Sequence, residues 1–309
     1  MPEETLAARV LKGDRRAVAR AMTLVENGQA PAGFMDEISR GLGKAFILGL
    51  TGPPGTGKST LVDRIVSEYR KKKVKVGVIA IDPTSPITGG ALLGDRIRMN
   101  RHTMDSGVFI RSMASRGWSG GLSGAVSEAI QILDAAGTQV VIIETVGIGQ
   151  SDIEVMKIAH VVVVVTMPGL GDDVQVSKAG LMEIGDIYAV NKSDLPGAGA
   201  MVINLLSVVR DMKGRSPPVL SVSALRGGGV EPLFDAIEVL RRKFLSPEGK
   251  EMRLRSVRGM IVELAKKRLF REFEGRAFAK STELATKVVD HSMTFEQAAG
   301  LLAQSQRKR

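Results

Sequence analysis

The amino-acid sequence predicts an α/β protein built on a doubly wound, mostly parallel sheet, with helical segments at both ends of the chain. The first observation is that short apolar segments alternate with helical segments between residues 44 and 245. The second is that these segments are continuous runs rich in Val and Ile, as expected of strands covered on both faces. The predicted strands are Ala45–Leu50, Lys75–Ile81, Val108–Ile110, Val140–Glu144, Val161–Thr166, Ile187–Val190 and Val219–Ser221.

Helical segments separate most of these strands. They are expected to begin near Lys58, Asp95, Leu122, Asp152, Val174, Ala198 and Gly229. In a sheet of this kind the ligand lies outside the carboxyl ends of the strands. The sequence therefore divides into an N-terminal helical segment (residues 1–43), a central α/β domain (residues 44–245) and a C-terminal helical region (residues 246–309).

The two ends of the chain show helical periodicity. The apolar stripe of the N-terminal segment consists of Leu6, Val10, Ala17, Ala21, Leu24 and Val25. In the C-terminal region a short helix closes at Leu301-Leu302, and a longer one carries an apolar face made of Ile261, Leu264, Ala265 and Leu269. An amphipathic helix buries its apolar face, so this face must cover either its own domain or a second subunit.

The positive charge of the chain is dispersed along the sequence. The formal net charge is +10 over 309 residues, and the lysine run Lys71–Lys73 lies at the end of a predicted helix. Cations at that position suit the helix dipole. Aromatic residues make up only 4% of the chain and do not interleave with basic residues as in single-stranded nucleic-acid binders. A solvated helix end is therefore favoured over a nucleic-acid site.

The chain contains no cysteine, which excludes disulfides and thiolate metal ligands. His102, His160 and His291 lie far apart in the sequence, without metal-ligand spacing. No apolar stretch follows the acidic start of the chain, and Val161–Thr166 is too short to cross a bilayer. We therefore expect a cytoplasmic protein with no membrane partner. An organelle-targeting segment removed before residue 1 is the alternative.

The strongest motif is the octapeptide Gly52-Pro53-Pro54-Gly55-Thr56-Gly57-Lys58-Ser59, which fits the phosphate-binding pattern G-x-x-x-x-G-K-[ST] in full. It follows a predicted strand and opens a predicted helix, as the motif requires. Its glycines let backbone N–H groups close around phosphate oxygens, and the helix N-terminus adds positive potential. We expect Gly52–Thr60 to bind nucleotide phosphates, with Lys58 at the β- and γ-phosphates and the Ser59 hydroxyl on Mg²⁺.

A second motif, Asn191-Lys192-Ser193-Asp194, follows the predicted strand Ile187–Val190. It fits the N-K-x-D loop that reads guanine. The Asp194 carboxylate would accept from the ring N1–H and the exocyclic amine, a pattern that adenine lacks, while Asn191 supports the loop and the stem of Lys192 packs on the base. The segment Ser223-Ala224-Leu225 follows the next strand, and its backbone would contact the guanine oxygen. Together with the phosphate loop, these motifs favour GTP over ATP.

Carboxylates follow several of the predicted strands. Asp82 ends the strand Lys75–Ile81, Glu144 ends the strand before Thr145, and Asp95 stands in Gly94-Asp95-Arg96. Hard carboxylate oxygens near the phosphate loop are what a nucleotide-bound Mg²⁺ needs, directly or through water. We therefore expect Mg²⁺ near Ser59, Asp82, Asp95 and Glu144, although Asp95 suits a helix N-cap equally well.

A glycine-rich loop runs from Pro168 to Gln175 and on to Lys178. On one interpretation it ends in a capping box, in which Asp172 caps a helix and Gln175 reciprocates. On the other it is a mobile element that senses the nucleotide or a partner. The residues alone leave the two interpretations open.

With these motifs the chain resembles the MeaB/ArgK-type GTPases, which are chaperones associated with methylmalonyl-CoA mutase. The likeness covers nearly the whole chain. The segments most specific to the family are Asp82 to Asp95 and Glu144 to Gln150. The matching motifs are Gly13-Asp14-Arg15-Arg16, Gly52–Thr60, Asp82-Pro83-Thr84-Ser85, Thr88-Gly89-Gly90, Gly94-Asp95-Arg96, Glu144-Thr145-Val146-Gly147-Ile148-Gly149-Gln150, Pro168–Gln175 with Lys178, and Asn191–Asp194.

The resemblance implies a homodimeric, slow GTPase that docks on an adenosylcobalamin-dependent acyl-CoA mutase, gates cofactor loading and protects or reactivates the mutase. It also implies that the C-terminal helices form a dimerisation arm. The glycine-rich loop, with Asp172, Asp173, Gln175 and Lys178, would be a switch that relays the nucleotide state to the mutase. Related GTPases that deliver nickel carry Cys and His ligands, so the absence of Cys and of a His cluster argues against a nickel site.

The predicted reaction is phosphoryl transfer from GTP to water, driven by positioning and charge neutralisation. Lys58, Mg²⁺ and backbone amides would stabilise the developing charge, Glu144 would hold the metal, and Asp82 would orient the attacking water. One alternative is a kinase-like protein linked to amino-acid transport, which a phosphotransfer assay with labelled GTP and ATP distinguishes. The other is a scaffold whose nucleotide only holds the fold, and turnover that rises with the mutase would exclude it.

Overall fold

A computed structural model gives the structure of the chain. It describes residues 4–43, 45–82, 100–102, 104–114, 122–145, 147, 153, 155–169, 181–210, 212 and 216–304. The described residues include a seven-stranded sheet with the strand order β3-β2-β4-β1-β5-β6-β7, and every pair of neighbouring strands is parallel. The strands are β1 Phe46–Thr51, β2 Val76–Asp82, β3 Val108–Ala114, β4 Val140–Glu144, β5 Val161–Thr166, β6 Ile187–Val190 and β7 Val219–Ser221.

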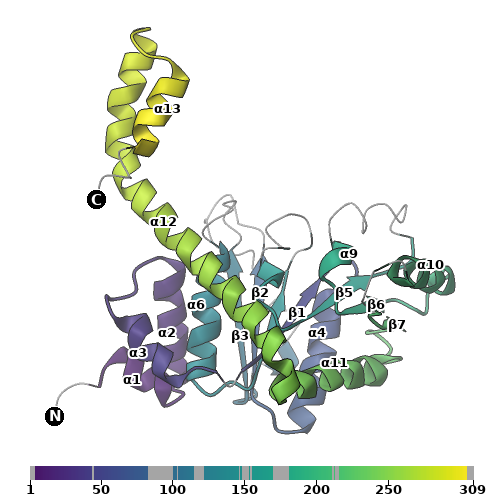
Figure 1. Cartoon of the computed structure of the whole chain (residues 1–309). Helices are drawn as coiled ribbons and strands as arrows, with labels where there is room; N and C mark the ends of the chain where they lie inside the picture. Colours follow the sequence, from purple (N-terminus) through teal and green to yellow (C-terminus); the bar gives the residue numbers. More distant parts are fainter. Residues whose placement is uncertain are drawn as a thin grey trace.

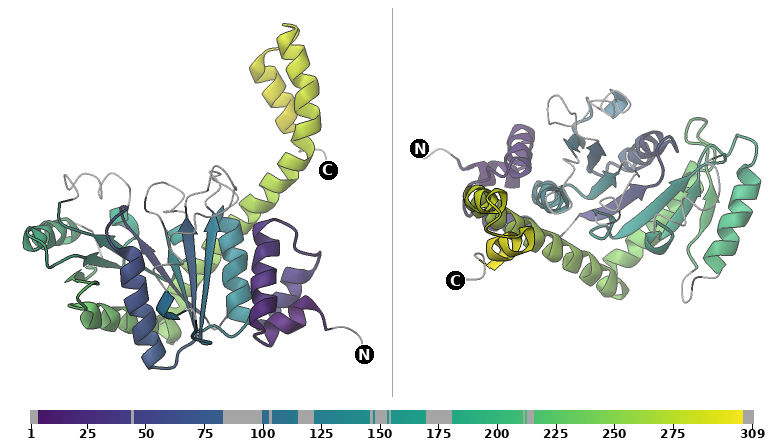
Figure 2. Two further views of the ribbon diagram at one scale, coloured as in Figure 1. Left: turned by 180° about the vertical axis from the view of Figure 1, so that it is seen from behind. Right: turned by 90° about the horizontal axis from the view of Figure 1, so that it is seen from above.

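The predicted fold class is confirmed, because this sheet is parallel and helices cover both of its faces (Figures 1 and 2). Strand β3 is longer than predicted: it pairs with β2 up to Ala114 instead of ending at Ile110. The helices of the central part are α4 Lys58–Lys71, α6 Leu122–Ala135, α9 Leu181–Ile184, α10 Ala198–Arg210 and α11 Val230–Leu245, with short 3-10 turns η1 Ser39–Gly41, η2 Asn100–His102 and η3 Pro247–Gly249.

The side chains of β1 alternate between two separate hydrophobic cores. Phe46, Leu48 and Leu50 pack with α4 and α11 on one face of the sheet. Ile47 packs with α6 and the N-terminal helices on the other face. All six residues of β1 are buried. A central parallel strand must be apolar on both sides, which explains its continuous hydrophobic sequence.

The N-terminal segment forms three helices, α1 Leu6–Leu11, α2 Arg15–Glu26 and α3 Phe34–Ile38, which pack against α6. Asp14 caps α2, because its side chain accepts hydrogen bonds from the backbone N–H groups of Arg16 and Ala17. Arg9 also donates to Asp14, and this contact lowers the pKa of the Asp14 carboxyl below its ordinary value. The cap therefore stays ionised and fixes the turn between α1 and α2.

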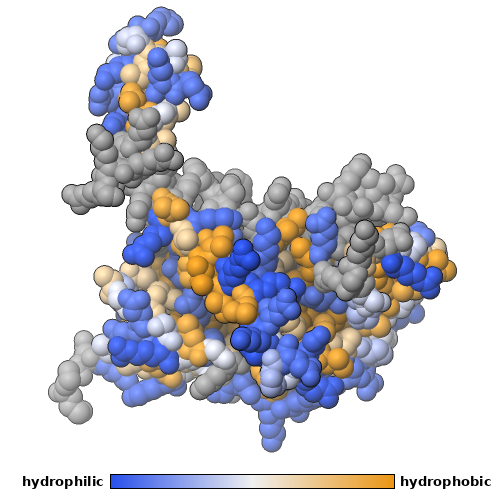
Figure 3. Space-filling view, in the orientation of Figure 1, coloured by the Kyte–Doolittle hydropathy of each residue, from blue (hydrophilic) through white to orange (hydrophobic). Residues whose placement is uncertain are grey.

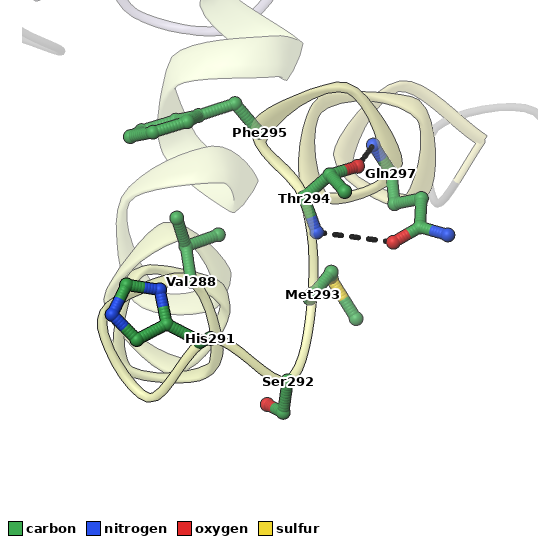
Figure 4. A pocket seen from close by; sticks show the side chains of 7 residues that line it. All are labelled: Val288, His291, Ser292, Met293, Thr294, Phe295 and Gln297. Atoms are coloured by element: carbon green, nitrogen blue, oxygen red, sulfur yellow. Dashed lines mark hydrogen bonds between the residues drawn. The ribbon is translucent and has the colours of Figure 1, made fainter.

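The C-terminal region is dominated by α12, a helix of 40 residues from Lys250 to Val289 that crosses the body and then projects away from it (Figure 1). At its end the chain turns, and α13 (Phe295–Gln304) folds back beside it. Thr294 and Gln297 form a reciprocal capping box at the start of α13, next to a small cavity of about 470 Å³ (Figure 4). None of the described helices is both long and apolar enough to cross a membrane.

The side of α12 that faces the body combines polar anchors with apolar contacts, since Met252 and Met260 pack against the two hydrophobic cores. The Ser256 hydroxyl donates to the backbone carbonyl of Ile158 at 2.6 Å, and Lys267 contacts Glu128 and the backbone carbonyl of Val25. Ser256 and Lys267 are both buried. These contacts tie α12 to the segment before β5, to α6 and to α2, so hydrogen bonds and an ion pair add to the apolar packing of its inner face.

The apolar face of α12 is turned outward, where Figure 3 shows a hydrophobic patch along the helix. The exposed fractions are 61% for Ile261 and 68% for Leu269, two members of the predicted face. Other exposed apolar residues of α12 are Leu254, Val257 and Val262 along the body, and Val289 at the end of the helix. We call Leu254, Val257, Ile261, Val262 and Leu269 the outer face of α12. Of the two occupants that the sequence left open, the chain's own domain leaves these residues 45% to 68% exposed, although Leu254 and Val262 also line a cavity that α12 forms with the body.

Candidate nucleotide site

The candidate site lies at the edge of the sheet where the parallel strands have their carboxyl ends. The loop from Gly52 to Gly57 joins β1 to α4, and the neighbouring strands β4, β5 and β6 end in Glu144, Thr166 and Val190. This is the edge at which ligands bind in doubly wound folds. The fold therefore brings the phosphate loop, the acidic strand end and the predicted guanine loop to one place.

Two glycines of the loop cannot be replaced without displacing its neighbours. Gly52 has a φ of +143°, and a Cβ there would lie 1.9 Å from the carbonyl oxygen of Val165. Gly57 has a φ of +86°, and its Cβ would lie 2.5 Å from the amide nitrogen of Asn191. The main chain can make these close approaches only without side chains. The two glycines therefore let the loop lie close to β5 and to Asn191, an arrangement in which its backbone N–H groups can surround phosphate oxygens.

Lys58 begins α4 and bends back over the loop. Its ammonium group donates to the carbonyl oxygens of Gly52 at 2.7 Å and Pro53 at 3.0 Å, and the residue is buried. The Thr56 hydroxyl donates to the same Pro53 carbonyl at 2.9 Å. A buried ammonium needs acceptors, and phosphate oxygens are stronger acceptors than neutral carbonyls. Lys58 is thus placed where a bound phosphate could take over its contacts.

Ser59 and Glu144 form a buried oxygen pair beside this lysine. The Ser59 hydroxyl donates to Glu144 Oε1 at 2.6 Å, and both residues are buried. Asp82 ends the neighbouring strand β2, two residues beyond Ala80, which pairs with Glu144 in the sheet, and it is also buried. A hydroxyl and carboxylates are hard ligands that fit Mg²⁺.

Within the described part of the chain, no three or more His, Cys, Asp or Glu residues group into a metal site. Mg²⁺ in nucleotide sites is held by one or two protein ligands together with phosphates and water. The oxygens of Ser59 and Glu144 therefore fit a metal that arrives with the nucleotide. They do not fit a metal that the protein holds alone.

Asn191 connects the two halves of the site. Its side-chain amide donates to the carbonyl oxygen of Thr56 in the phosphate loop at 2.7 Å, and its Oδ1 accepts from the backbone N–H of Ala224 at 3.0 Å. The residue is 2% exposed. Lys192 follows with a positive φ of 55°, which turns the chain sharply after β6. One amide side chain thus fixes the phosphate loop relative to the segment Ser223–Leu225.

The Asp194 carboxylate is held by a hydrogen bond and by an ion pair. The Ser223 hydroxyl donates to Asp194 Oδ1 at 2.6 Å, and the guanidinium of Arg226 lies 3.4 Å from Oδ2. The hydrogen bond from Ser223 is the main cause that lowers the pKa of Asp194 below its ordinary value. The carboxylate is ionised at neutral pH. An ionised carboxylate has two acceptor oxygens and can accept from two N–H donors at once.

Several predicted site residues are not placed by the structure. Asp95, Asp172, Asp173, Gln175 and Lys178 lie outside the described residues, as do the predicted helix starts near Asp95, Asp152 and Val174. Conversely, no sequence motif pointed to Arg64, whose guanidinium contacts the segment Ser223–Leu225 from α4. A basic residue inside an amphipathic helix is expected to be exposed to solvent, so only the tertiary structure shows this contact.

Comparison with known proteins agrees with the geometry. Residues 18–277 match the model of the family described as methylmalonyl Co-A mutase-associated GTPase MeaB. A protein of Pyrococcus horikoshii named as a GTPase is 52% identical, with 81% of this chain and 80% of that protein covered. GTPase ArgK of Escherichia coli is 38% identical, with 76% of each chain covered. A crystal structure described as LAO/AO transport system kinase superposes with a TM-score of 0.69 at 26% identity, covering 100% of this chain and 99% of that one.

Proposed function

Since the chain belongs to the family of methylmalonyl-CoA mutase-associated GTPases, we propose that this GTPase is the chaperone of an adenosylcobalamin-dependent acyl-CoA mutase. In this role it gates the loading of the cobalamin cofactor and protects or reactivates the mutase. The observation that supports the nucleotide assignment most strongly is the pair of hydrogen bonds that Asn191 makes to Thr56 and Ala224. They hold a phosphate loop and a base-reading segment in one rigid unit.

In the proposed complex GTP lies across this unit. The backbone N–H groups of Gly52–Thr60 surround the phosphates, and Lys58 exchanges its carbonyl contacts for phosphate oxygens. Asp194 accepts from the N1–H and amine of guanine, the backbone of Ser223–Leu225 faces the guanine oxygen, and the stem of Lys192 packs on the base. GDP occupies the same groups after hydrolysis.

Hydrolysis in the proposed mechanism depends on charge and position. Mg²⁺, when bound with the nucleotide, neutralises phosphate charge, and Ser59 and Glu144 are the described residues that would hold it. Lys58 stabilises the negative charge that develops on the transferred group. Asp82, buried at the end of β2, orients the attacking water. The reaction stays slow until a partner completes the site.

The coupling to the mutase is assigned to the glycine-rich loop, with Asp172, Asp173, Gln175 and Lys178 as its switch residues. A lysine there can pair with an acidic group when the partner orders the loop, through contacts that differ between nucleotide states. The mutase itself can be captured from the native extract with protein loaded with a GTP analogue. The proposed compartment is the cytoplasm.

Lys178→Ala is expected to leave GTP affinity and intrinsic hydrolysis nearly unchanged, because the residue lies outside both nucleotide loops. It is expected to remove most of the rate increase that the captured mutase causes, together with nucleotide-gated cobalamin transfer. GTPase rates are measured with and without saturating mutase, with Lys12→Ala, an exposed lysine of the N-terminal segment, as the matched control. Equal stimulation of both variants would contradict the switch assignment. A mutase that changes no GTPase rate would contradict the chaperone role.

We further infer a homodimer that is built on the outer face of α12. Each residue of this face has an exposed fraction of 45% or more. The helix itself projects beyond the body that it crosses. An exposed apolar stripe on a projecting helix favours association, since burying it removes apolar surface from water. A second copy of the chain presents the same stripe and can pack against it around a twofold axis.

Ile261→Glu is expected to weaken this dimer by at least about tenfold, because a buried carboxylate without a partner would replace an apolar anchor. The matched control is Ile203→Glu on α10, because Ile203 is exposed to a similar extent, 68% against 61% for Ile261. Sedimentation equilibrium gives the dissociation constants of both variants. A dimer that survives Ile261→Glu but not Ile203→Glu would move the interface to α10.

A further inference from the structure

We propose that Arg64 is a positioning residue that sets the base selectivity of the site. It does so by holding the segment Ser223–Leu225 from the side of α4. Arg64 is not part of either nucleotide motif and comes from the middle of α4. The inference rests on the proposed guanine site and adds to it a residue that does not touch the base. Its evidence is the set of hydrogen bonds that cross from α4 to the segment after β7.

The contact is bidentate and short. Arg64 Nε donates to the carbonyl oxygen of Ala224 at 2.8 Å, and its Nη2 donates to the carbonyl oxygen of Leu225 at 2.8 Å. The planar guanidinium therefore spans two successive peptide units with its fixed fork of donors. Hydrogen bonds from a charged donor are stronger than those between neutral groups, so both carbonyls are held in this direction.

The direction of these carbonyls decides where the neighbouring N–H groups point. In a trans peptide unit the C=O and the following N–H point to opposite sides. Because the carbonyls of Ala224 and Leu225 face Arg64, the N–H groups of Leu225 and Arg226 face away from α4. Donors that point away from α4 in this segment are the ones available to the oxygen at position 6 of guanine.

The far side of the segment is fixed as well. The backbone N–H of Ala224 donates to Asn191 Oδ1, and the Ser223 hydroxyl donates to Asp194. The turn is closed by the hydrogen bonds between Ser223 and both Gly227 and Gly228. Asn191 and Asp194 thus hold one side of the segment, and Arg64 is the described side chain that holds the carbonyls on the other side.

The helix that carries Arg64 is packed firmly against the sheet. Leu61 precedes Arg64 in the helix and Ile65 follows it, and both are fully buried in the core that contains Phe46, Leu48 and Leu50 of β1. The same helix begins with Lys58, at the proposed phosphate position. One rigid helix therefore sets the distance between the phosphate contacts and the base contacts, which is the distance that a nucleoside triphosphate must match.

Two base analogues separate the role of Arg64 from that of Asp194. In 6-thio-GTP a sulfur, a weak acceptor, replaces only the oxygen at position 6, while ITP lacks only the exocyclic amine. For Arg64→Ala we expect GTP to bind about tenfold more weakly and the preference for GTP over 6-thio-GTP to fall close to one. The preference for GTP over ITP should remain, because Asp194 is unchanged. Competition against a fluorescent GDP gives all dissociation constants.

Three further measurements distinguish positioning from general destabilisation. At saturating GTP the kcat of Arg64→Ala should equal that of the wild type, while KM rises. Arg64→Lys should recover part of the preference for GTP over 6-thio-GTP, because one donor can still reach a carbonyl. Arg70→Ala on the same helix removes an arginine that binds Asp105 and the carbonyl of Val74. It should lower the melting temperature without changing either base preference.

The outcomes separate this inference from the proposed function. If Asp194→Asn loses the preference for GTP while Arg64→Ala keeps the wild-type ratio of GTP to 6-thio-GTP, the role of Arg64 is overturned and the guanine site stands. If the wild type binds ATP as tightly as GTP, the guanine site fails, and with it the role of Arg64. A selective loss at position 6 in Arg64→Ala supports both.

Discussion

Lys58→Ala is expected to lower the GTP turnover number by about 100- to 1,000-fold, the effect of removing one group that stabilises transition-state charge. Lys58 is a buried ammonium at the start of α4, and its acceptors are carbonyls of the phosphate loop itself. Its charge therefore lies where phosphate oxygens would lie, away from the hydrophobic core. Steady-state release of phosphate from GTP, at saturating Mg²⁺, measures the loss.

A circular-dichroism melt of the same variant shows whether the fold survives. Lys71→Ala is the matched control, because Lys71 ends the same helix and pairs with Glu68 on the surface. It should keep wild-type turnover. Ser59→Ala adds a second variant from the same phosphate-binding motif. It loses the hydroxyl bound to Glu144 and should require more Mg²⁺ for the same rate. Turnover near the wild-type value in folded Lys58→Ala would refute the assignment of the site.

The sheet could be predicted because its signal is local. A strand covered on both faces is a continuous apolar run, so the runs that contain β1, β4 and β5 stand out without any knowledge of their neighbours. The starts of α4 and α10 follow from a phosphate motif and from the turn residues Pro196-Gly197. The position of the loops of the site could then be predicted as well, because parallel strands present their carboxyl ends at one edge of the sheet.

The role of α12 could not be predicted from its pattern. The periodicity shows an apolar face with Ile261 and Leu269, but not which side of the helix the body covers. The body holds the opposite side through Ser256 and Lys267, whose partners are a backbone carbonyl near β5 and Glu128 on α6. Such polar contacts leave no periodic signal, because their partners lie 98 and 139 positions away in the sequence.

The role of His160 could not be predicted from the sequence either. In the sequence it is an isolated histidine without metal-ligand spacing. In the structure its Nδ1 accepts from the backbone N–H of Ile47 at 2.9 Å, and its ring stacks on Phe244. Burial lowers the pKa of His160 to about 3, with Arg255 and Arg253 adding to the effect. The histidine therefore stays neutral and extends the pairing of β1 with β5, a role that only the folded chain defines.

Asp194→Asn is expected to shift the preference of the protein from GTP towards xanthosine triphosphate. The ionised carboxylate of Asp194 can accept from both the N1–H and the amine of guanine, and the hydrogen bond from Ser223 lowers its pKa below the ordinary value. An amide offers one acceptor and one donor, so it leaves the guanine amine without a partner. It matches xanthine, which has a carbonyl oxygen in place of that amine.

The expected loss of GTP affinity in Asp194→Asn is on the order of 100-fold, the scale of a lost two-point contact to a charged group. Competition binding of GTP, xanthosine triphosphate and ATP gives the three affinities for the variant and for Asp36→Asn, the same change at an exposed position outside the site. Asp36→Asn should keep the wild-type order of affinities. An unchanged preference for GTP in Asp194→Asn would mean that another loop reads the base. The hydrogen bonds of Asn191 to Thr56 and Ala224 would then serve only to join the phosphate loop to the segment after β7.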